Sequence, residues 1–68
     1  MNMKITVNGN MREVPEGTTL KALVESLALK GDRIACERNL DVVPRAQYAE
    51  TKLAEGDKLE IVTFVGGG

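Results

Sequence analysis

The first hydrophobic residues of the chain stand two apart, which is the period of a β-strand with one buried face. Met3, Ile5 and Val7 carry this period. Residues 8–10, Asn-Gly-Asn, tolerate positive φ, and a short second run follows at 11–14. The pattern therefore predicts a β-hairpin at the start of the chain.

A helical period replaces the alternation in the next segment. Thr18 or Thr19 can cap the N-terminus of a helix, and Gly31 is the expected C-terminal stop. Apolar side chains recur at i, i+3, i+4 and i+7, namely at Leu20, Leu23, Val24 and Leu27. One helix of this length cannot bury its apolar stripe alone, so we expect it to lie across a sheet.

Alternation returns after the helix. Ile34 and Cys36 indicate a third strand, and a turn begins at Asn39. Pro44 lacks an N–H donor, which favours an edge strand or a loop at that point. Residues 45–51 have no clean period, whereas 52–53 suit a very short strand and 55–57, Glu-Gly-Asp, a turn.

The last strand is expected over residues 58–65. Leu59 and Ile61 alternate with polar neighbours, before Val62, Phe64 and Val65 make the run almost wholly apolar. A strand that is apolar on both faces suits a central position in a sheet. The helical crossover permits it to run parallel to the first strand.

This order of elements predicts an α+β domain of the ubiquitin-like β-grasp type. We expect a mixed four- to five-stranded sheet with one main helix packed on one face. A length of 68 residues with 43% apolar residues suits one small domain. Residues 1–65 are assigned to this domain and 66–68 to a flexible C-terminal glycine tail.

The strand phases leave one face of the sheet without a cover. The positions expected to face the helix are Ile5, Val7, Ile34, Cys36, Leu59 and Ile61. Thr6, Ala35, Val62 and Phe64 then point to the other side, where Val62 and Phe64 form an apolar patch suited to a partner. The alternative is that residues 45–51 fold over this patch.

Composition excludes several classes of function. The net charge is −1 with basic residues scattered along the chain, so neither nucleic acid nor an anionic membrane is an expected partner. One cysteine and no histidine allow no disulfide within the chain and no Cys/His metal site. With no signal or membrane-spanning segment in view, we expect a cytoplasmic protein.

Three glycines at the end of the chain have few physical uses. They contribute no side chain to a core, but Gly66 and Gly67 can thread through a channel too narrow for a Cβ atom. The reactive group would be the α-carboxylate of Gly68. A carboxylate is a poor electrophile, so a partner enzyme must activate it, for instance as an adenylate. The protein would then be a substrate or carrier and not an enzyme.

Three other side chains invite functional interpretations. The strand phase of Cys36 places it in the core, where a thiol is usually inert. Arg38 and Arg45 are candidates for pairing with carboxylates on a partner. No arrangement of residues suggests catalysis.

Several short segments resemble the ThiS family, the sulfur carrier proteins of thiamin (thiazole) biosynthesis. The most specific is residues 43–48, Val-Pro-Arg-Ala-Gln-Tyr, which is similar to that family's hydrophobic-Pro-Arg-x-Gln-aromatic segment. Residues 37–39, 56–57, 60–62 and 65–68 also match. Tyr48 departs from the tryptophan that is common at its position.

The resemblance implies a defined cycle. An E1-like adenylyltransferase of the ThiF type would use ATP to adenylate Gly68. Sulfur originating from cysteine desulfurase chemistry would convert the adenylate to a thiocarboxylate, which donates sulfur to a thiazole synthase of the ThiG type. The carrier itself would bind no cofactor. Val62, Phe64 and Val65 would contact partners, while Gly66 and Gly67 form the slender tail.

Three other functions remain open on sequence grounds. A sulfur carrier for molybdopterin synthesis would use the same chemistry on a similar fold. A ubiquitin-like protein modifier would form isopeptide bonds through the same terminus. A binding module would not need its terminal glycines at all.

Overall fold

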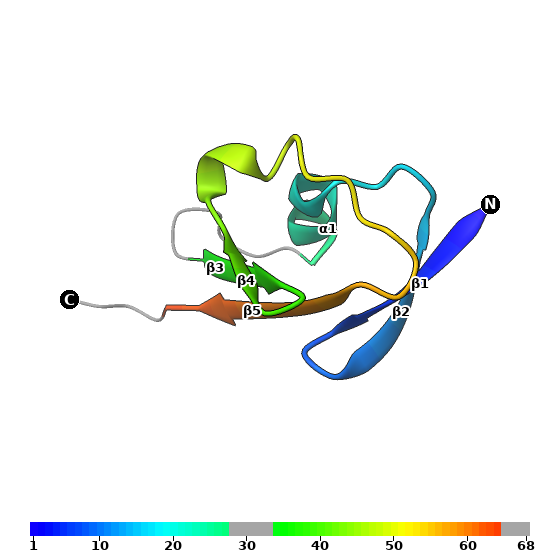
Figure 1. Ribbon diagram of the computed structural model, residues 1–68, viewed down its shortest axis with the longest axis horizontal. Coiled ribbons are helices and arrows are strands. Elements are labelled where there is room, and N and C mark those ends of the chain that lie inside the picture. The colour runs from blue at the N-terminus through cyan, green and yellow to red at the C-terminus, as the bar shows by residue number, and fades with distance from the viewer. Residues whose placement is uncertain (28–33, 65–68) are drawn as a thin grey trace.

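The structure is a computed structural model, and it describes residues 1–27 and 34–64. Five strands and one α-helix make up this part of the chain (Figure 1). In chain order the elements are β1 (Asn2–Val7), β2 (Asn10–Pro15), α1 (Leu20–Ser26), β3 (Ile34–Arg38), β4 (Asp41–Val43), a 3₁₀ helix (Arg45–Gln47) and β5 (Lys58–Thr63).

The five strands form one mixed sheet in the order β2-β1-β5-β3-β4. β5 is central, runs parallel to β1 and pairs antiparallel with β3. The predicted central position and parallel pairing of the last strand are both confirmed. β4 is an edge strand that ends just before Pro44, and this proline, which lacks an N–H donor, lies in the loop that follows.

The predicted hairpin joins β1 and β2 in an unbroken register from Asn2↔Pro15 to Val7↔Asn10. Its turn residues Asn8 and Gly9 have φ values of 52° and 84°. This positive-φ pair suits a tight hairpin turn, whose twist matches that of the flanking strands.

Thr19, the second of the two predicted caps, begins α1. Its hydroxyl accepts a hydrogen bond from the backbone N–H of Ala22 at 3.1 Å. The helix ends at Ser26 with Leu27 as its C-cap. The expected stop at Gly31 lies outside the described residues. Leu20, Leu23 and Val24 are buried, as their helical period predicts.

Residues 45–53, for which no regular period is visible, pass over the same side of the sheet as α1 (Figure 1). A 3₁₀ turn follows Pro44, and Tyr48 is buried in the core. Backbone bonds fasten this segment to the start of the helix, from Leu20 N–H to the Thr51 carbonyl at 2.8 Å and from Lys21 N–H to the Tyr48 carbonyl at 3.1 Å. The short strand expected at 52–53 is not formed, and an isolated bridge between Thr19 and Lys52 stands in its place.

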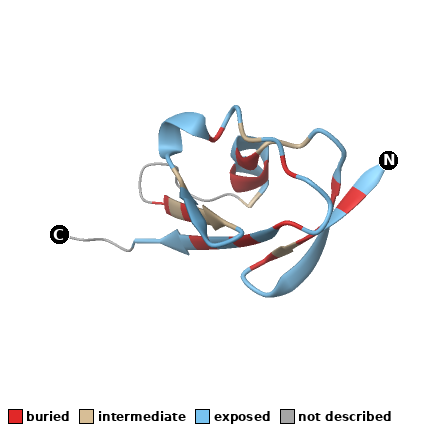
Figure 2. Cartoon of the chain, viewed as in Figure 1, coloured by how far each residue is buried: buried red, intermediate tan, exposed pale blue. Residues whose placement is uncertain are grey.

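The hydrophobic core lies between α1, residues 45–53 and the covered face of the sheet (Figure 2). Its buried members are Met3, Ile5, Val7, Val14, Leu20, Leu23, Val24, Ile34, Cys36, Tyr48, Leu53, Leu59 and Ile61. All six strand positions predicted to face the helix are among them. Within residues 1–27 and 34–64, no helix is long and apolar enough to span a bilayer.

Candidate functional site

The candidate site is built on β5, the strand that leads to the C-terminal glycines. Two asparagine side chains extend the pairing of this strand. Asn8 Nδ2 donates to the Ile61 carbonyl at 3.0 Å and Asn8 Oδ1 accepts from the Ile61 N–H at 2.8 Å, so its amide continues β1 beyond Val7. On the other side, Asn39 Oδ1 accepts from the Lys58 N–H at 3.0 Å. β5 is therefore held from both neighbours along most of its length.

The face of β5 away from α1 carries the predicted apolar patch. Val62 is 52% exposed and stands opposite Ala35 of β3, and Phe64, one residue beyond β5, is 57% exposed. The alternative cover for this patch is wrong. Tyr48 anchors residues 45–51 in the core on the helix side, so this segment cannot also lie on the opposite face. No described residue covers this surface around Ala35, Val62 and Phe64, and we call it the open face.

The predicted chemistry at the end of the chain stays a prediction. Val65 and the three glycines that follow it, Gly66, Gly67 and Gly68, lie outside the described residues. The expected tail over 66–68 and Val65 of the expected strand are therefore untested by the structure. The expected strand over 58–65 is too long at its end, because Phe64 is described and lies outside any strand. β5 itself ends at Thr63.

Arg38 has an intramolecular partner. Its Nε donates to Asp57 Oδ2 at 2.8 Å, and the same carboxylate accepts from Asn39 Nδ2 at 3.1 Å and from the Ala54 N–H at 2.8 Å. Burial acts to raise the pKa of Asp57, but the hydrogen bonds from Ala54, Asn39 and Arg38 outweigh it and lower the pKa. The Arg38 guanidinium thus joins the end of β3 to the turn before β5.

Sequence reasoning missed the contact of Asp57 with Arg38, Asn39 and Ala54, which we call the Asp57 cluster. Asp57 is 6% exposed although it stands in a Glu-Gly-Asp segment that is typical of a solvated turn. The sequence carries only a weak signal for this contact, since Gly56-Asp57 and Glu37-Arg38-Asn39 are separate matches to one family and nothing local joins them. Contact of Arg38 with a partner remains a prediction for a side chain that is 31% exposed.

Arg45 lies apart from Arg38, at the start of the 3₁₀ helix. It is exposed and lines a groove between that helix and α1, together with Lys21, Glu25 and Tyr48. The structure therefore does not bring the two candidate arginines together. Arg45 is on the helix side, whereas Val62 is on the open face.

Cys36 is 1% exposed, as its strand phase predicts. Burial raises the pKa of its thiol, and the nearby Tyr48 hydroxyl offsets only part of that effect. Burial, followed by interaction with Cys36, raises the pKa of Tyr48 to about 12. Both groups are neutral at physiological pH, so Cys36 is a packing residue and not a thiolate nucleophile.

The described residues offer no alternative chemistry. Among them no group of three or more His, Cys, Asp or Glu side chains could hold a metal ion. Every buried side-chain nitrogen or oxygen in residues 1–27 and 34–64 has a hydrogen-bond partner. The surface that stands out among the described residues is therefore the open face, on the strand that precedes the C-terminal glycines in the sequence.

A single helix on a five-stranded mixed sheet with a central, parallel last strand defines a ubiquitin-like β-grasp domain. A solved structure designed on the template of human erythrocytic ubiquitin has this fold, with a TM-score of 0.55 over 98% of this chain and 95% of that one. At 19% sequence identity this likeness shows the fold alone.

Within this class, the chain belongs to the ThiS family, whose sequence model matches residues 5–68. The crystal structure of the thiamine biosynthesis protein ThiS from Geobacter metallireducens superposes with a TM-score of 0.83 at 30% identity. It covers 97% of this chain and 100% of that one. The sulfur carrier protein ThiS of Bacillus subtilis is 38% identical over 50 residues, which are 74% of this chain and 76% of that protein.

A second kind of relative is longer. The thiazole synthase of Paramagnetospirillum magneticum is 44% identical over 66 residues, which are 97% of this chain but 20% of that protein. The chain thus spans about a fifth of the length of this relative. The resemblance inferred from the short sequence segments is confirmed by the family match.

Proposed function

We propose that the chain is a sulfur carrier of thiamin biosynthesis, whose Gly68 carboxylate is adenylated and then converted to a thiocarboxylate. The observation that carries the proposal is the position of β5 in a chain of the ThiS family. This strand is fixed in the middle of the sheet, exposes Val62 on an uncovered face and is followed in sequence by Phe64, Val65 and three glycines.

The chemistry requires an enzyme other than this chain. A carboxylate does not accept nucleophiles readily and must first be activated. Attack of the Gly68 carboxylate on the α-phosphorus of ATP would form the acyl adenylate and release pyrophosphate. A persulfide formed by cysteine desulfurase chemistry would then attack the acyl carbon through its outer sulfur and expel AMP. A thiol reductant would cleave the resulting acyl disulfide and leave the thiocarboxylate. A partner enzyme would perform these steps, and the chain would be its protein co-substrate.

The partners follow from the same steps. An E1-like adenylyltransferase of the ThiF type would supply the ATP site, and the open face would dock on it while the glycines enter its active site. The proteins of Paramagnetospirillum magneticum and Magnetococcus marinus that contain a segment similar to this chain are named thiazole synthases. Their names support a thiazole synthase of the ThiG type as the acceptor of the sulfur.

The experiment is intact mass spectrometry of the full chain after incubation with a ThiF-type enzyme, ATP, a cysteine desulfurase, cysteine and a thiol reductant such as dithiothreitol. We expect one oxygen to be replaced by sulfur at Gly68. A variant with one alanine added after Gly68 is the matched control, because it keeps the fold and blocks the carboxylate position. An unchanged mass of the wild-type chain would contradict the proposal, as would equal conversion of the extended variant.

A genetic experiment separates the pathways. The gene is expected to restore growth of a thiamin auxotroph that lacks its own carrier and to leave a molybdenum-cofactor mutant uncorrected. Covalent conjugates of higher mass would instead indicate a protein modifier. A chain that works without Gly67 and Gly68 would indicate a binding module.

A further inference from the structure

Two glutamates stand opposite one another on the open face of the sheet. Glu37 of β3 and Glu60 of β5 are direct partners in the antiparallel register. The Asn39 N–H donates to the Lys58 carbonyl at 2.8 Å, and since hydrogen-bonded pairs alternate along the ladder, the pair of Glu37 and Glu60 is also hydrogen-bonded through the backbone. Side chains in such a pair lie on the same face with their Cβ atoms about 5 Å apart.

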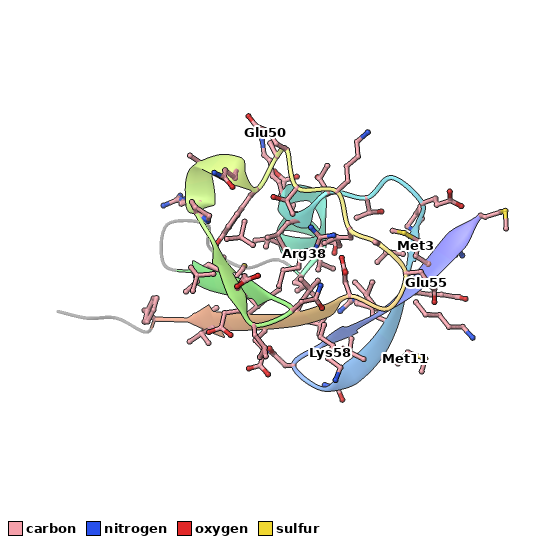
Figure 3. All side chains as sticks on the ribbon, in the orientation of Figure 1. Met3, Met11, Arg38, Glu50, Glu55 and Lys58 are labelled. Carbon is pink, nitrogen blue, oxygen red and sulfur yellow. The ribbon has the colours of Figure 1, made fainter. Side chains whose placement is uncertain are left out.

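This arrangement costs stability in the free protein. Like charges directly opposite one another on a sheet repel, by an amount comparable to the few tenths of a kcal/mol that opposite charges contribute there. Among residues 1–27 and 34–64 the one salt bridge joins Arg38 to Asp57, and neither glutamate takes part in it. Lys58, which is labelled in Figure 3, stands two residues before Glu60 in β5 and therefore on the same face, but it forms no salt bridge with either carboxylate.

Apolar side chains flank the two glutamates. Val62 and Ala35 form the next pair on this face toward the end of β5. Val42 of the edge strand β4 stands directly opposite Glu37 on its other side and is 70% exposed. The two carboxylates therefore lie between two exposed valines.

A partner that covers the valines must also remove water from the carboxylates. Burying an ionised carboxylate without a counter-charge costs several kcal/mol, so this cost would oppose the binding of a purely apolar partner surface. A cation between the two carboxylates would relieve both the desolvation cost and their mutual repulsion. Two carboxylates with no third acidic, histidine or cysteine side chain beside them do not make a metal site, which favours a side-chain cation.

We infer that the open face docks on a protein surface that places an arginine between Glu37 and Glu60 while its apolar side chains cover Val62 and Val42. A guanidinium group has five N–H donors in one plane and can bond two carboxylates at once. This inference rests on the proposed function for the identity of the partner, which is the E1-like enzyme that adenylates Gly68.

The test compares two double variants that remove the same charge. Glu37→Gln with Glu60→Gln removes the carboxylate pair, whereas Glu25→Gln with Glu50→Gln removes two exposed carboxylates from outside the open face. The purified ThiF-type enzyme and ATP are supplied in both cases. Pyrophosphate release gives KM and kcat for each carrier, calorimetry gives Kd, and thermal unfolding gives Tm.

The pair variant is expected to raise KM and Kd at least about tenfold with kcat unchanged, as expected when a desolvated charge pair loses a partner. Its Tm is expected to equal or exceed that of the wild type, because a repulsion has been removed. The control variant is expected to stay within about twofold in Kd. The dependence of Kd on salt is expected to be weaker for the pair variant than for the control.

Equal KM and Kd for the two double variants would overturn the inference, as would an equal salt dependence. If the pair variant were to unfold, the single change Glu60→Gln at an exposed position gives the same comparison against Glu50→Gln. Failure of the proposed function has a different signature. In that case the wild-type chain forms no adenylate, while calorimetry still reports whether the carboxylate pair governs binding to the enzyme.

Discussion

The two faces of the sheet are made by the same strands but have opposite relations to the fold. On β5, Leu59 and Ile61 are 1% and 6% exposed and pack in the core, whereas Val62, which follows Ile61, is 52% exposed. The covered face combines apolar contact with full burial. The open face combines exposed valines with two opposed carboxylates, neither of which helps the domain fold. Residues that stabilise and residues suited to recognition are thus separated by one step along the same strand.

The largest difference between the faces is expected on truncation of a side chain. Leu59→Ala removes a buried side chain and is expected to cost about 2–5 kcal/mol in the free energy of unfolding. Val62→Ala, on the other face of the same strand, is expected to cost no more than about 0.5 kcal/mol. Urea unfolding of both variants measures the two costs, and similar values would show that the open face is also covered.

The Asp57 cluster gives the next effect. Asp57→Asn removes the charge that Arg38 meets and is expected to cost about 1–3 kcal/mol, whereas Asp41→Asn at an exposed position is the control with little effect. Because the pKa of Asp57 in the folded state is below its ordinary value of 3.8, its contribution is complete above that value and is lost as the pH falls through the lower one.

Urea unfolding across the acid range tests this assignment. The wild-type chain is expected to lose its advantage over Asp57→Asn as the pH drops below 3.8. A difference between the two proteins that does not change with pH in this range would contradict the role given to the carboxylate.

The next prediction concerns Tyr48 on the covered face, whose ionisation affects stability at alkaline pH and not at neutral pH. The chain has one tyrosine and no tryptophan, so phenolate absorbance reports this side chain alone. The folded protein is expected to titrate near the raised pKa of about 12 and not near 10.0. Because the folded-state pKa is the higher one, the contribution of the Tyr48 hydroxyl to stability is complete below pH 10.0 and is lost as the pH rises toward 12. The variant Tyr48→Phe is expected to lack this loss, and a wild-type midpoint near 10.0 would argue against burial of the hydroxyl.

The smallest effect on stability is expected at Phe64, together with a large effect on docking. Phe64→Asp is expected to change the free energy of unfolding by no more than about 0.5 kcal/mol, because the ring is 57% exposed. Adenylation of this variant by the ThiF-type enzyme is expected to fall sharply, while Lys52→Asp, an exposed change on the helix side, serves as the control. A folded Phe64→Asp chain with wild-type KM would remove the apolar patch from the docking surface.

Much of the fold follows from local pattern. The period of two at Met3, Ile5 and Val7 and the helical period from Leu20 identify which residues are buried, because burial repeats with the geometry of each element. Pro44 correctly marks an edge, since a residue without an N–H cannot sit in a central strand. Apolar residues on both faces at the end of β5 correctly indicate the central position of this strand.

The candidate site is less accessible from sequence because it depends on register. Glu37 and Glu60 are 23 positions apart in the numbering, and only the pairing of β3 with β5 makes them neighbours. Asp57 is likewise buried by groups at the end of β3, so a local turn pattern cannot reveal it. The residue type of Asn8 indicates that it tolerates positive φ. Its role in continuing β1 depends on hydrogen bonds to the distant Ile61, which the sequence does not reveal.

The central position of β5 has a consequence for how the molecule is made. The hairpins β1–β2 and β3–β4 pair with each other only through β5, which is the last strand in the chain. A nascent chain that has left the ribosome only as far as Gly56 therefore holds two hairpins without a common sheet. The same final strand that joins them also brings Glu60 to Glu37 and Val62 to Ala35. A partner enzyme that reads this surface would thus engage finished, folded molecules and pass over incomplete ones.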